Sequence, residues 1–156
     1  AFESAAAIAH AEPGLDCGLH LNLTEGPSVA DASTIPSLAN VDGFIYHHPA
    51  DLWIALWMGR VQTADIEREI RAQLGKAVTA GVDISHIDGH KHVHAVRPVL
   101  QAVLRVASEF GVKAIRSTTE AAPELLSVLR RNMAAAIALP VDFVSEPGDR
   151  ILYPLI

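Results

Sequence analysis

Four of the eight histidines of this chain lie within nine consecutive residues, 86–94, together with one aspartate. In an extended backbone, alternate side chains point the same way, so all five would share one face. In a helix, only three of the histidines would align. Both geometries concentrate imidazole and carboxylate, the ligands that suit zinc and related divalent ions. The spacing therefore favours a metal-binding or catalytic role over a histidine-rich surface loop, without naming the metal. The five residues are His86, Asp88, His90, His92 and His94.

Another histidine, His20, lies in a stretch of alternating character at residues 15–23. Its apolar positions are every second residue, and His20 is on the polar side, which is the pattern of a half-buried strand. Glu25-Gly26-Pro27 ends this strand. His47 and His48 are adjacent in a turn-rich segment, so their side chains point apart and we expect both on a loop surface.

The composition excludes several classes of protein. Hydrophobic residues make up 50% of the chain and charged residues 19%, which is typical of a folded globular protein and not of a disordered one. The formal charge of −6 leaves no basic surface for nucleic acid. No apolar run is long enough to cross a membrane, and Cys17 is a lone cysteine, so we expect a cytoplasmic protein without an intrachain disulfide.

Helix and strand patterns alternate along the chain. Thr63 is a candidate N-cap and Gly81 a candidate C-terminal stop of one helix, and Pro98 suits the start of the next. This order predicts an α/β fold with parallel strands built from βα units, whose ligands gather where the strands end. The histidine stretch lies at such an end. Strands are expected at 15–23, 82–87, 112–115 and 141–144, and helices at 1–11, 52–58, 63–80, 98–110 and 123–138.

About four strands are expected, whereas a closed βα barrel has about eight. The chain also begins inside a helical pattern and ends on an apolar segment. These features predict that residues 1–156 are a single partial domain, truncated at both ends. Trp53 and Trp57 are four residues apart on a short helix, which favours core packing, with an aromatic face beside a sugar site as the alternative.

Two segments together resemble the YdjC-like carbohydrate deacetylases, the family that includes chitooligosaccharide deacetylase. The first is Gly-Leu-His-Leu-Asn-Leu-Thr-Glu-Gly at residues 18–26, and the second is the histidine stretch at 86–94. The similarity extends over about residues 1–116. It implies an incomplete or distorted (βα) barrel and a divalent ion, magnesium or zinc, held by one aspartate and two histidines. By motif, those histidines are His20 and His90.

The resemblance also implies the reaction and the partners. The expected activity is a metal-dependent hydrolysis that removes the acetyl group from an N-acetylated sugar or chito-oligosaccharide. The substrate partner would be a small carbohydrate. Independently of the resemblance, the sheet edge left exposed in a truncated domain favours a homodimer. Asp88 and His94 are candidate catalytic residues, the latter as proton donor to the leaving amine. His86 and His92 would support the ligands, and Arg116 would bind substrate hydroxyls or simply close its strand on the surface.

This chain departs from the family pattern in two places. It has no Asn-Ala-Asp-Asp-Phe-Gly segment, whose aspartates supply the metal ligand and the general base in the family. It also has no later His-Pro-Gly segment. We therefore expect the 156-residue chain to bind metal weakly and to deacetylate poorly. Two other readings remain open, an inactive metal- or sugar-binding protein and another βα-barrel metallohydrolase such as a phosphoesterase or amidohydrolase.

Overall fold

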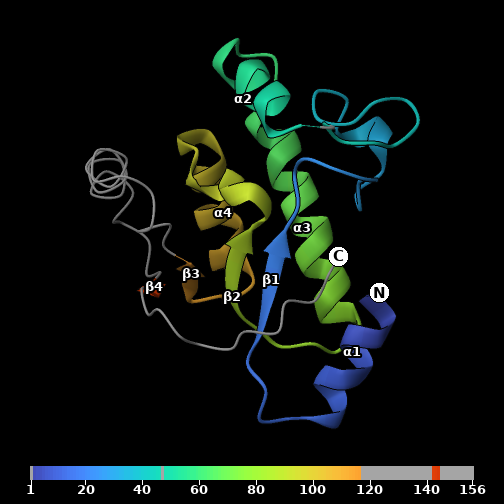
Figure 1. Cartoon of the computed structure of the whole chain (residues 1–156), viewed down its shortest axis with the longest axis vertical. Coiled ribbons are helices and arrows are strands. Elements are labelled where there is room, and N and C mark those ends of the chain that lie inside the picture. Colours follow the sequence, from blue (N-terminus) through green and yellow to red (C-terminus); the bar gives the residue numbers. More distant parts are fainter. Residues whose placement is uncertain (1, 47, 117–141, 145–156) are drawn as a thin grey trace.

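The computed structural model describes residues 2–46, 48–116 and 142–144. Four strands form one parallel sheet in the order β1-β2-β3-β4 (Figure 1). Neighbours in the sheet are also neighbours in the chain, as successive βα units require. The predicted α/β fold with a parallel sheet is confirmed. The strands are β1 (Cys17–Leu21), β2 (Ile84–Gly89), β3 (Ala114–Arg116) and β4 (Asp142–Val144).

The helices begin and end close to the predicted positions. Gly81 and Gly111 follow α3 and α4 with φ of 73° and 71°, the left-handed conformation that a C-terminal glycine supplies. The N-cap of α3 is Gln62 rather than Thr63, which is already helical, so that prediction was one residue late. The predicted helix at 123–138 lies outside the described residues. The helices are α1 (Phe2–Ala11), α2 (Pro49–Trp57), α3 (Thr63–Thr79) and α4 (Arg97–Glu109), with 3-10 turns η1 (Ala32–Thr34) and η2 (His90–Ala95).

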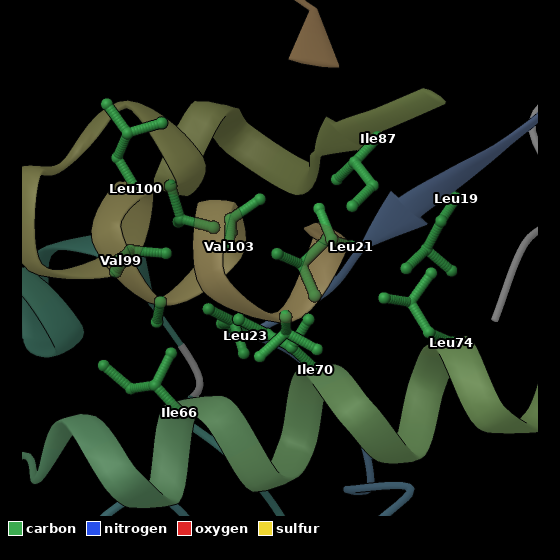
Figure 2. Close-up of a cluster of buried hydrophobic side chains, with 14 of the residues drawn as sticks. Leu19, Leu21, Leu23, Ile66, Ile70, Leu74, Ile87, Val99, Leu100 and Val103 are labelled. Atoms are coloured by element: carbon green, nitrogen blue, oxygen red, sulfur yellow. The ribbon is translucent and has the colours of Figure 1, made fainter. Parts of the chain in front are cut away.

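The core lies between the sheet and helices α3 and α4 (Figure 2). Leucines at every second position of β1 and beyond it point toward an apolar stripe on α3. The stripe repeats every four residues, which places its side chains on one helix face. Full burial of each such side chain stabilises the fold by roughly 1.5–3 kcal/mol. The buried residues of this cluster include Leu19, Leu21, Leu23, Ile66, Ile70, Leu74, Ile87, Val99 and Val103.

The strand register sets which side chains occupy the other face of the sheet. Gly18 pairs with His86, and His20 pairs with Asp88. Leu19 and Leu21 face the helices, so the alternating residues Gly18 and His20 face away from them. On β2, Ile87 is in the core, so its neighbours His86 and Asp88 also face away from the helices. The face opposite α3 and α4 therefore carries His20, His86 and Asp88 side by side.

The aromatic residues of α2 are not in the core. Trp53 and Trp57 are 51% and 89% exposed, while Leu52 and Ala55 on the same helix are buried. The prediction of core packing for the two tryptophans was wrong, because the helix buries its leucine side instead. Among the described residues, no helix is both long and apolar enough to span a membrane.

Candidate metal and catalytic site

The histidine stretch is neither one strand nor one helix. It stays extended through Gly89 and then turns into η2, so the alternation predicted for five residues holds only for His86 and Asp88. Lys91 and His92 adopt left-handed backbone angles, with φ of 50° and 54°. This conformation costs roughly 1–2 kcal/mol for each non-glycine residue, and such strain gathers at functional sites. At the start of this turn, His90 lies close to His20 of β1.

His20 and His90 lie close together although 70 residues separate them. Nε2 of His20 is 3.2 Å from Nδ1 of His90, and the rings meet edge to face at an interplanar angle of 81°. Two imidazole nitrogens that share a tetrahedral zinc ion at ~2.1 Å each are about 3.4 Å apart. The spacing and donor type of this pair therefore suit a shared divalent ion.

Asp88 lies behind His20, on the ring edge away from His90. Its Oδ2 is 3.3 Å from Nδ1 of His20 and accepts a hydrogen bond of 3.2 Å from Arg116, while Oδ1 accepts one of 2.7 Å from the backbone N–H of Gly89. Burial alone would raise the pKa of this carboxyl. The hydrogen bonds from His20 and Gly89 and the charges of His94 and Arg116 outweigh burial and lower the pKa to about 2. Asp88 is therefore an anion near neutral pH.

A second carboxylate, Glu25, lies on the far edge of His90. Its Oε2 is 3.5 Å from Nε2 of His90, and its Oε1 is paired with the Lys91 ammonium. The hydrogen bond from Lys91, aided by His90, lowers the pKa of Glu25. Glu25 was not among the predicted site residues. Its position just after β1, in the segment 18–26, was the available signal, but nothing local indicated that it reaches His90.

His94 is buried against the end of β2. Its Nε2 is 3.1 Å from the carbonyl oxygen of Arg116, and its Nδ1 packs on Gly89, where a Cβ atom would lie only 2.2 Å away. Burial lowers the pKa of the imidazole despite the nearby Asp88 carboxylate, which favours the neutral ring. These contacts support the end of β3 and β2, and a role as proton donor stays a prediction.

A different grouping of ligand atoms also exists here. Asp88, His92 and His94 each offer one atom within 4.8 Å of the others. However, His94 uses one nitrogen on a backbone carbonyl and packs the other on Gly89. His92 is exposed, with its ring centroid 6.1 Å from that of His94. The described residues therefore offer two candidate groupings for an ion, this one and the facing nitrogens of His20 and His90.

His86 and Arg116 occupy the edges of the cluster. His86 is buried, its Nδ1 is 2.9 Å from the Ser85 hydroxyl, and its Nε2 packs on Gly18, where a Cβ would lie 2.1 Å away. Burial lowers its pKa as well. Arg116 donates to Asp88, so part of its guanidinium is used within the protein. Its predicted contact with substrate hydroxyls stays a prediction.

Comparison with known proteins places this chain in a family. The family model described as YdjC-like protein matches residues 1–147. The chain belongs to the YdjC-like family. The resemblance seen in the two sequence segments is thereby confirmed at the level of the family, and the match extends beyond residue 116.

Several curated relatives of this YdjC-like chain carry the name carbohydrate deacetylase. A Brevibacillus brevis protein is 40% identical over 71% of this chain and 42% of its own length. A Danio rerio protein is 35% identical over 66% of this chain and 33% of its own, and a Listeria monocytogenes protein is 35% identical over 72% and 43%. The chain thus spans less than half the length of these relatives.

A solved structure shares the fold. It is a candidate cellobiose-phosphate cleavage protein from Enterococcus faecalis, superimposed with a TM-score of 0.68 at 23% identity. The match covers 85% of this chain and 49% of that one. At this identity the comparison bears on the fold alone.

Proposed function

We propose that this YdjC-like chain carries part of the active site of a metal-dependent hydrolase that removes the acetyl group from an N-acetylated sugar or chito-oligosaccharide. The names of the curated relatives support the reaction. The observation that carries the proposal is the line of groups Asp88–His20–His90, in which two imidazole nitrogens face each other and a buried carboxylate lies behind one ring.

The donor set indicates how an ion would be held. His20 would bind through Nε2 and His90 through Nδ1, since these are the atoms that face each other. Imidazole donors suit zinc better than magnesium, which prefers oxygen ligands. A bound divalent ion supplies Lewis-acid polarisation of the acetyl carbonyl and activation of the attacking water.

Asp88 would keep His20 in the tautomer that can bind an ion. With its proton on Nδ1, which lies 3.3 Å from Oδ2 of Asp88, His20 would hold the tautomer whose Nε2 lone pair points at His90. Both oxygens of Asp88 are already engaged, by His20 and Arg116 on one side and by Gly89 on the other. This geometry supports an orienting role for Asp88 more than a role as general base.

The test combines zinc binding with acetate release. The purified chain would be stripped with a chelator, reloaded with zinc or magnesium, and assayed on N,N′-diacetylchitobiose. We expect zinc to bind and to restore any acetate release, and His20→Ala to lose both. His10→Ala, on the exposed side of α1, is the matched control and should change neither.

Each failure has a distinct meaning. Zinc binding that His20→Ala leaves unchanged would contradict the proposed ion site. Zinc binding at His20 without acetate release, even in the longest natural form of the protein, would favour the inactive metal- or sugar-binding alternative over a hydrolase.

A further inference from the structure

We infer that Glu25 is a positioning residue for His90, as Asp88 is for His20, and that helix α3 holds the loop that presents it. This inference rests on the proposed ion site between the two histidines. Each ring then has one nitrogen toward the ion position and the other toward a carboxylate: Asp88–His20 on one side, His90–Glu25 on the other.

The geometry of His90 sets this role apart from direct ligation. Its Nδ1 faces His20 and its Nε2 faces Glu25, and the two nitrogens are on different edges of the ring. Glu25 is therefore behind the ring, where it would accept the Nε2–H and leave the Nδ1 lone pair for an ion. Carboxylate partners of this kind fix the tautomer and raise the basicity of a ligating histidine.

Glu25 also contacts Lys91, which follows His90 in the chain. Its second oxygen pairs with Lys91, the first of the two left-handed residues that turn the chain after His90. One carboxylate thus lies against both the His90 ring and the Lys91 ammonium. An isolated surface ion pair contributes only about 0–1 kcal/mol, so the contact with Lys91 alone would mean little. The loop that carries Glu25 is, in addition, anchored to α3.

The loop that carries Glu25 is tied down by a fully buried carboxylate on α3. Glu69 accepts hydrogen bonds of 2.9 Å from the backbone N–H groups of Val29 and Ala30. Gln73, one helical turn later, donates to Glu69 and exchanges two hydrogen bonds with the backbone of Asn22. Both ends of residues 22–30 are thereby attached to the same helix.

Asn22 completes the link to Glu25. Its side chain donates to the carbonyl oxygen of Glu25 and accepts from the backbone N–H of Thr24. Burying a carboxylate is costly unless its oxygens accept hydrogen bonds, and within the described part of the chain Glu69 accepts them from Val29, Ala30 and Gln73. The result is a rigid support that presents an otherwise half-exposed glutamate to His90.

The experiment compares three variants of the whole chain. Glu25→Ala removes the acceptor, Glu25→Gln keeps an uncharged acceptor, and Glu12→Gln removes one charge from an exposed site beyond α1. Zinc affinity is measured by calorimetry, and the side-chain nitrogen shifts of His90 are measured by NMR in the metal-free chain. We expect Glu25→Ala to weaken zinc binding by ~10–100-fold and to change the tautomer balance of His90. Glu25→Gln should recover part of both, and Glu12→Gln should match the unaltered chain.

Zinc affinity in Glu25→Ala equal to that in Glu12→Gln, with unchanged His90 shifts, would overturn the inference. If the unaltered chain binds no zinc, the proposed ion site is contradicted, and the His90 shifts of the metal-free variants still decide the role of Glu25. Thermal unfolding of each variant separates a local effect on the site from a loss of fold. Glu69→Ala serves as the example of a loss of fold, because it leaves the backbone N–H groups of Val29 and Ala30 without their acceptor.

Discussion

At the scale of single residues, equal spacing in the histidine stretch does not give equal roles. His90 faces His20, His94 is buried on Gly89, and His92 is exposed at a left-handed position. We predict that His90→Ala weakens zinc binding by more than the ~10–100-fold typical of losing an outer hydrogen-bond partner, and that His92→Ala keeps it. Calorimetric titration of both variants checks this. Equal losses would favour the grouping of Asp88, His92 and His94 instead.

The carboxylate behind His20 gives a second prediction at this scale. Asp88→Asn preserves the shape but removes the charge that holds the Nδ1–H of His20, so zinc affinity should fall by ~10–100-fold. Asp83→Asn is the matched control, because it removes one charge from an exposed position before the same strand. Titrations that show the same affinity for the two variants would remove Asp88 from the ion site.

At the scale of elements, the junction between β2 and η2 depends on glycine. A Cβ on Gly89 would lie 2.2 Å from Nδ1 of His94, whereas a Cβ on Gly75, within α3, would meet nothing within 4 Å. We predict that Gly89→Ala destabilises the fold by ~1–3 kcal/mol through overpacking. Gly75→Ala should stabilise it by about 0.4–1 kcal/mol through lower unfolded-state entropy and better helix propensity. Urea unfolding measures both, and the same sign for the two variants would contradict the described packing.

At the scale of the whole molecule, the free energy of unfolding at acid pH depends on the ionisation of Asp88. The pKa of Asp88 is lowered from 3.8 to about 2, so folding favours its ionised form. Its contribution, of order 2 kcal/mol, is present above pH ~4 and is lost as the pH falls toward 2. We predict that the unfolding free energy of Asp88→Asn falls less steeply between pH 5 and 2 than that of the unaltered chain. Urea unfolding across this range tests it, and parallel curves would show that the carboxyl is not held as an anion.

The sequence by itself determined the parallel βα architecture and the C-terminal ends of α3 and α4, and it singled out residues 86–94 as a candidate site. These depend on local rules: apolar periodicity, glycine at helix ends and the ligand preferences of imidazole and carboxylate. Two short segments were also enough to indicate the YdjC-like family, which the family match over residues 1–147 confirms.

Only the tertiary structure decided which groups meet. The pairing of His20 with Asp88 depends on strand register across the sheet, and His90 approaches His20 just before two residues in left-handed conformations. Neither is a local preference, since left-handed Lys91 and His92 are unfavourable in isolation. The approach of Glu25 to His90 joins two segments 65 residues apart, which no local pattern indicates. Long-range packing selects one ring orientation among several that the local sequence permits.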